Sequence, residues 1–170
     1  MEARLLILAD LGNVKAYKAD LTPLGSPHLD LIEHKIIEDA HGRIVDKVTD
    51  LAGRRAAPTA RDWGSPASDD HNLLLETKRR IIKQIASHIK RISEANGFSH
   101  IWIAAHKEIL NMIIDELPQN IRGKVELHLA RDLTKAPMEK LLKYFGNIIL
   151  ESIKNQTTEP NQKTNSTTNQ

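Results

Sequence analysis

The sequence predicts an α/β domain built on a mixed β-sheet, and the order of its hydrophobic patterns is the main reason. Three short runs with strand periodicity come first, at about residues 3–9, 14–19 and 30–38. A long amphipathic helix pattern, a buried strand, a second helix, another strand and a third helix follow. The order β-β-β-α-β-α-β-α combines an antiparallel meander with two helix–strand crossovers. We therefore expect helices packed on a sheet whose two middle strands contain residues 5–8 and 101–105.

The first two strands are expected to form a hairpin. Leu5–Leu8 is a continuous apolar run, typical of a strand buried on both faces. The turn that follows, Asp10-Leu11-Gly12-Asn13, suits a hairpin because Gly12 and Asn13 tolerate a positive φ. The third strand is more polar, and we expect it at an edge of the sheet.

The helices have recognisable ends. The first long helix is expected to be capped by Asp69 or Asp70 and to be closed by Asn96-Gly97 in a left-handed conformation. Thr134 is expected to cap the last helix, with Pro137 in its first turn. The apolar stripe of the last helix is Met138, Leu141, Leu142, Phe145, Ile148, Ile149 and Ile153.

Composition indicates one domain over residues 1–154, with a mobile loop at about 51–70 and a disordered polar tail over 155–170. The absence of cysteine excludes disulfides, thiolate metal sites and a cysteine nucleophile. The apolar run before Asp10 is too short for a signal peptide, and nothing approaches a membrane span. A cytoplasmic location without membrane association is therefore expected.

The element order is similar to that of ribonuclease-H-like domains, and this similarity raises the question of a two-metal nuclease. Asp10, at the end of the first strand, and Glu76, early in the first long helix, are the candidate catalytic carboxylates of a divalent-metal nuclease or phosphoryl hydrolase. The strand at 101–105 is followed by His106 and Lys107, so no third carboxylate is supplied there. The simpler interpretation makes Asp10 a turn former and Glu76 a solvated helix residue.

No other catalytic or cofactor motif is present. The eight histidines show no paired metal-ligand spacing, and neither a GxSxG elbow nor a glycine-rich phosphate loop occurs. We therefore expect no cofactor and no metal site.

Basic residues gather in the middle of the chain, although the net charge is only +2. Distribution matters more than net charge for nucleic-acid binding, and a merely solvated surface is the alternative. The candidate contacts to nucleic-acid phosphates are Arg54, Arg55, Arg61, Lys78, Arg79 and Lys83.

Two segments are distinctive: LLILADLGNVKAYKA (residues 5–19), and residues 101–137, which contain the motif Arg-Asp-Leu-Thr-Lys-Ala-Pro (131–137). Both resemble segments of the bacterial host attachment protein family. That family is similar in turn to the middle domain of class-I release factors and of Pelota, which agrees with the element order. The Gly-Gly-Gln of release factors is missing from residues 51–70, so peptidyl-tRNA hydrolysis is not expected.

The resemblance leads to three hypotheses for function. The first is a non-catalytic cytoplasmic protein that binds the ribosome or RNA through the basic loop and helix. The second is a nuclease centred on Asp10 and Glu76. The third, implied by the family name, is a factor required for attachment to host cells, with an indirect role because no export signal or anchor is recognised.

Overall fold

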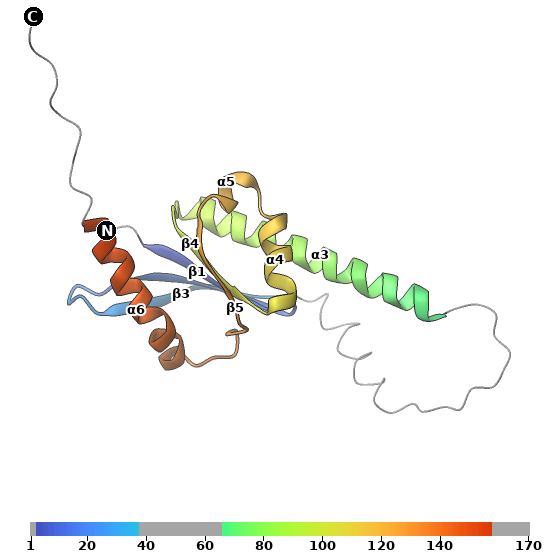
Figure 1. The fold of residues 1–170 in the computed structure, drawn as a ribbon, viewed down its shortest axis with the longest axis horizontal. Helices are drawn as coiled ribbons and strands as arrows, with labels where there is room; N and C mark the ends of the chain where they lie inside the picture. The colour runs from blue at the N-terminus through green and yellow to red at the C-terminus, as the bar shows by residue number, and fades with distance from the viewer. Residues whose placement is uncertain (1–2, 38–65, 158–170) are drawn as a thin grey trace, which may run out of the picture.

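The fold is a five-stranded mixed sheet with helices on both faces. The computed structural model describes residues 3–37 and 66–157 (Figure 1). The strands are β1 (Arg4–Ala9), β2 (Asn13–Leu21), β3 (Pro27–Ile36), β4 (Ile101–Ala105) and β5 (Val125–Ala130). The helices are α3 (Pro66–Ala95), α4 (Lys107–Glu116), the short α5 (Gln119–Arg122) and α6 (Met138–Thr157). The predicted mixed α/β class is confirmed.

The sheet order is β3-β2-β1-β4-β5. β1 pairs antiparallel with β2 and parallel with β4, and Leu5 lies opposite Ile101 in the second of these pairs. β2 pairs antiparallel with β3, and β5 pairs parallel with β4. Residues 5–8 and 101–105 are therefore neighbouring strands, as predicted, and the polar third strand is an edge strand.

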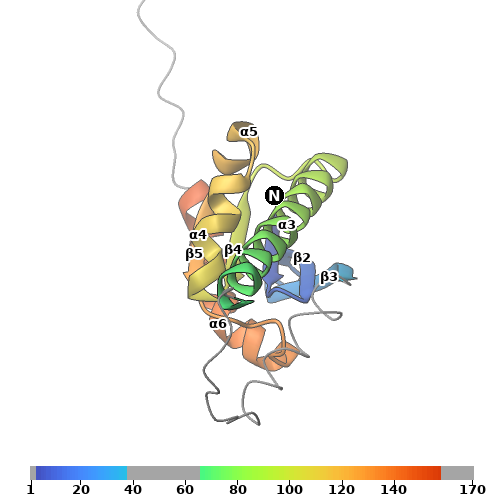
Figure 2. The same cartoon turned by 90° about the vertical axis from the view of Figure 1, so that its right-hand side faces the viewer.

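The alternation of side chains along β1 creates two hydrophobic cores. Leu5 and Ile7 belong to the core beneath α3 and α4, whereas Leu6 and Leu8 belong to the core beneath α6. All of β1 is buried, as a continuous apolar run predicts. Figure 2 shows α3 and α4 side by side on one face of the sheet and α6 on the other.

Trp102 connects β4 to α6. Its ring stacks on Phe145 with ring centroids 6.2 Å apart and planes inclined by 18°. Both side chains are about 1% exposed, so this pair lies at the centre of the second core. With so few aromatic residues in the chain, one stacked pair and many aliphatic side chains fill the interior.

Several predicted boundaries are corrected. α3 begins at Pro66, so Asp69 and Asp70 lie inside its first turns and do not cap it; proline is favoured at the first position of a helix. Its other end is as predicted, because Gly97 has φ +66° and Phe98 N donates to Ser93 O. α5 was not predicted, since four residues carry no helical periodicity.

The predicted loop and the predicted tail lie partly outside the described residues, and one member of the predicted α6 stripe is corrected. The predicted loop falls there up to residue 65, while residues 66–70 belong to α3. In α6, Met138 is 39% exposed and so does not belong to the buried stripe. α6 reaches Thr157, past the predicted domain end at 154, and residues 158–170 are outside the described part.

Candidate functional site

Asp10 and several other polar residues meet at one edge of the sheet. β1, β4 and β5 are parallel, so the turn after β1, the start of α4 after β4 and the segment after β5 come together beyond their carboxyl ends. In open α/β sheets this is the edge at which ligands usually bind. An open pocket of about 360 Å³ lies there, lined by Asp10, Leu11, Gly12, Asn13, His106, Glu108, Ile109, Asp132 and Lys135.

Asp10 organises the turn between β1 and β2. Its Oδ1 accepts hydrogen bonds from the backbone N–H groups of Gly12 and Asn13, both at 2.6 Å. The Asn13 side-chain amide donates to the same carboxylate at 3.3 Å. Gly12 does not have a positive φ, so the carboxylate, and not a left-handed glycine, holds this turn. The interpretation of Asp10 as a turn former is confirmed.

Thr134 joins this turn to the segment after β5. Its hydroxyl lies 2.7 Å from Asp10 Oδ2 and also 2.7 Å from Asp132 Oδ1, while its backbone N–H donates to Asp132 Oδ1 at 2.9 Å. Lys15 Nζ donates to the Thr134 carbonyl oxygen at 2.6 Å. The prediction that Thr134 caps the last helix is wrong, because α6 begins only at Met138 and the hydroxyl is used here. We call Asp10, Thr134 and Asp132 the carboxylate latch.

The latch gives the motif Asp132–Pro137 a structural reason. Asp132 closes a local turn on Thr134, Leu133 is buried in the core beneath α6, and Thr134 reaches across to Asp10, 124 residues earlier. Pro137 precedes α6, and its carbonyl oxygen accepts from Lys140 N and Leu141 N. A hydroxyl has one proton, so Thr134 donates to one carboxylate at a time.

The rim of the pocket carries mixed charge. His106 is the N-cap of α4, and its Nδ1 accepts weakly from Glu108 N at 3.4 Å. Glu108 forms an exposed ion pair with Lys78 of α3, with Nζ 3.8 Å from Oε2. Lys78 therefore lies against α4, on a different side of α3 from the solvent-facing residues.

The two carboxylates suggested for a nuclease do not line the same pocket: Asp10 lines the pocket at the latch and Glu76 does not. Asp10 already accepts from backbone and side-chain donors on both oxygens. Glu76 is exposed, and helix geometry puts it about 140° around α3 from the fully buried Ile81. Within residues 3–37 and 66–157, no three histidine or acidic residues are grouped as a metal site would require.

The outward face of α3 carries a line of basic side chains. Arg79, Lys83 and Lys90 are exposed and fall within about 40° around the helix axis, opposite the buried Ile81. We call these three residues the α3 outer stripe, and the exposed Arg80 lies beside it. Arg80 and Lys90 were not among the predicted phosphate contacts, although helical spacing from Arg79 would have added Lys90 to them.

Three predicted phosphate contacts cannot be placed on this surface. Arg54, Arg55 and Arg61 lie outside the described residues. Of the predicted set, Arg79 and Lys83 belong to the α3 outer stripe, while Lys78 is half-buried and directed to Glu108.

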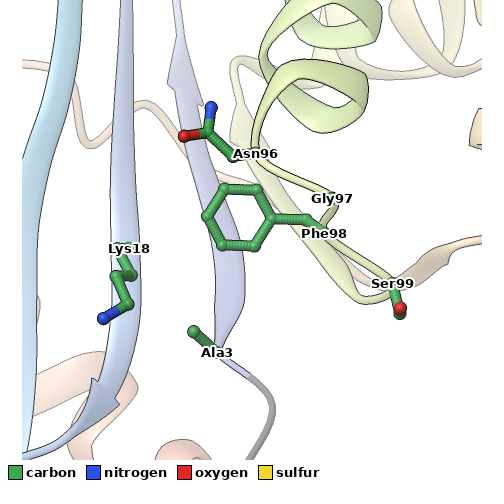
Figure 3. A pocket seen from close by; sticks show the side chains of 6 residues that line it. All are labelled: Ala3, Lys18, Asn96, Gly97, Phe98 and Ser99. Carbon is green, nitrogen blue, oxygen red and sulfur yellow. The ribbon is translucent and has the colours of Figure 1, made fainter.

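A second pocket, of about 330 Å³, lies at the opposite end of the strands (Figure 3). It is lined by Ala3, Lys18 and the segment from Asn96 to Ser99, with the Phe98 ring between Asn96 and Ala3. Its one charged lining residue, Lys18, is paired with Asp20 at 2.7 Å. The pocket at the latch, with several convergent polar groups, is therefore the stronger candidate site.

The fold and this edge define a mixed α/β domain in which one hairpin is fastened to the segment before the last helix. The chain belongs to the family described as "Protein required for attachment to host cells", whose model matches residues 5–145. This match runs from β1 into α6 and includes all three residues of the carboxylate latch.

Other comparisons add little. None of the curated proteins compared with the chain matches it. A solved structure described as an archaeal protein is similar with a TM-score of 0.40 and 8% identity, covering 91% of this chain. This chain spans only 38% of that protein. No helix in residues 3–37 or 66–157 is long and apolar enough to cross a membrane.

Proposed function

We propose that this protein binds RNA, on the ribosome or free, through phosphate contacts to the α3 outer stripe, and that it does so without catalysis. The observation that carries the proposal is the alignment of Arg79, Lys83 and Lys90 on the exposed side of a long helix. Contacts from lysine and arginine to phosphates supply most of the sequence-independent affinity of proteins for nucleic acids.

The geometry of the stripe suits an extended polyanion. Lys90 follows Arg79 by eleven residue positions, which corresponds to about 16 Å along the helix axis. The first turns of α3 extend beyond the sheet, so the helix is accessible along its outer side (Figure 1). Among the described residues, none of the three cations forms an ion pair, so all three are available to phosphates.

The positions and hydrogen bonds of Asp10 and Glu76 support binding of RNA without its cleavage. Asp10 is held by the turn and by Thr134, and Glu76 is on the solvent side of α3. A two-metal site needs several oxygen ligands converging on the ions, which these two residues do not supply. The nuclease hypothesis predicts that the wild type cleaves RNA when Mg²⁺ is added and that Asp10→Asn abolishes the cleavage. We expect no cleavage by the wild type or by Asp10→Asn.

We further infer that the domain is ribonuclease-H-like, in the form found in release-factor middle domains. The support is the order β3-β2-β1-β4-β5, in which β2 alone runs opposite to the other strands. An experimental structure superposed on both fold groups tests this inference, and a better match to an unrelated sheet topology would contradict it.

The role in attachment to host cells is, in this proposal, indirect and exerted from the cytoplasm. The family description supports the role. Protease treatment of intact cells tests the location. We expect the protein to survive until the cells are lysed, whereas digestion on intact cells would favour a surface adhesin.

The binding proposal is tested with two variants that carry the same change in charge. Arg79→Gln/Lys83→Gln/Lys90→Gln removes the stripe, and Lys107→Gln/Lys140→Gln/Lys143→Gln removes three exposed cations from α4 and α6. Sedimentation with ribosomes and fluorescence anisotropy with labelled RNA measure the binding. We expect the first variant to lose at least tenfold in affinity and the second to stay near the wild type, and equal losses would contradict the proposal.

A further inference from the structure

A buried histidine lies where edge strand β3 meets α3. His88 of α3 is 6% exposed, and its Nε2 lies 3.5 Å from Glu33 Oε1 of β3. Arg91, one helical turn further, donates from Nη2 to Glu33 Oε2 at 2.6 Å. The same Nη2 lies 3.2 Å from His88 Nδ1. These three side chains, which we call the β3–α3 triad, connect the edge strand to the helix.

The contacts define the protonation state of the imidazole. An arginine guanidinium has donors only, so the Arg91 contact requires His88 Nδ1 to be an acceptor. The proton of the neutral ring is therefore on Nε2, which faces the Glu33 carboxylate. A second proton on Nδ1 would remove the acceptor and place an N–H against the Arg91 donor.

The surroundings also disfavour a charged imidazole. Burial lowers the pKa of His88, and nearby Arg91 and Lys35 lower it further, while Glu33 opposes them. Lys35 lies on β3 on the same face as Glu33. The next charged groups on that side are already engaged: Lys18 pairs with Asp20 at 2.7 Å and interacts with Asp30, and Asp30 contacts His28 Nε2 at 2.8 Å.

We propose that His88 makes the attachment of β3 to α3 sensitive to mild acid. With a neutral imidazole, Arg91 bridges His88 and Glu33 and the strand is held. Protonation puts three cations, His88, Arg91 and Lys35, around one carboxylate and takes away the acceptor for Arg91. The protein then favours conformations in which β3 separates from α3 and the imidazole reaches water.

The direction of the pH dependence follows from linkage. Because the pKa of His88 is lower in the folded protein than its ordinary value of 6.5, the open state binds the proton more tightly. The contribution of His88 is complete above that ordinary value and is lost as the pH falls through the folded pKa. The Arg91 hydrogen bond lowers the pKa of Glu33 from its ordinary 4.5, so loss from Glu33 begins only in stronger acid.

Two NMR measurements test this inference. The first follows the imidazole Cε1–H signal of His88 against pH in the unmodified protein. The second compares backbone amide exchange of β3 in the wild type and in His88→Gln at matched pH between about 7 and 5, the range in which histidine titrates. Glutamine offers both a donor and an acceptor but does not titrate, so comparison at equal pH cancels the intrinsic pH dependence of exchange.

We expect His88 to titrate below 6.5 and wild-type β3 to open more than the variant in acid, by up to about tenfold for each unit of pKa depression. His34→Gln, at an exposed histidine of the same strand, should keep the wild-type response. A His88 midpoint at or above 6.5, or equal acid loosening in His88→Gln, would overturn the inference. If the variant fails to fold, the titration of the unmodified protein still decides.

Discussion

A single threonine hydroxyl connects the two ends of the domain. Thr134 is 2% exposed and contacts Asp10 and Asp132, so it couples the first hairpin to the segment that leads into α6. Its replacement by an apolar side chain would remove this donor from the half-buried Asp10 carboxylate and from the exposed Asp132 carboxylate, which share it. A hydrogen bond to a charged group contributes more than one between neutral groups.

Thr134→Val should therefore lower the free energy of unfolding by about 1–3 kcal/mol, because valine matches the shape of threonine without its hydroxyl. Urea denaturation measures the change. Thr134→Ser, which keeps the hydroxyl, should lose much less. If valine and serine behave alike, the latch is not a stabilising contact.

At the scale of elements, α3 contributes both to stability, through its C-terminal end and its buried face, and to the proposed binding, through its outer face. Its C-terminal end turns through Gly97 at φ +66°, with no atom within 4 Å of the position a Cβ would take. The cost of a side chain there is therefore one of backbone conformation and not of steric contact. The buried face of α3 packs in the core beneath α3 and α4, and its outer face carries the proposed phosphate contacts.

Gly97→Ala should destabilise the protein by about 1–2 kcal/mol, the usual cost of a left-handed conformation for an L-residue. Gly123→Ala provides the comparison, since Gly123 has φ −63° and a Cβ there would lie 3.5 Å from Gln119 O. Thermal unfolding of both variants gives the difference. An equal effect at the two positions would show that backbone conformation is not the cause.

At the scale of the whole molecule, the element order was predictable because each strand and long helix has its own local pattern. The apolar runs at 5–8 and 101–105 indicated central strands, and β1 and β4 do pair. The beginning of α3 was not predictable in the same way, because the composition around Pro66 is that of a loop.

The candidate site was only partly predictable. Asp10 was identified as a turn residue from its neighbours, and Arg79 and Lys83 from the concentration of basic residues in the middle of the chain. The contact between Asp10 and Thr134 had no local signal, since it depends on β1, β4 and β5 ending at the same edge. The β3–α3 triad likewise joins residues more than 50 positions apart in the chain.

The most direct test of the account is the salt dependence of RNA affinity. Each phosphate contact adds about 0.7–0.9 to the slope of log affinity against log salt. We therefore predict that Arg79→Gln/Lys83→Gln/Lys90→Gln reduces the magnitude of that slope by about 2. Lys107→Gln/Lys140→Gln/Lys143→Gln should leave the slope as in the wild type. A slope unchanged by loss of the α3 outer stripe would contradict the proposed binding surface.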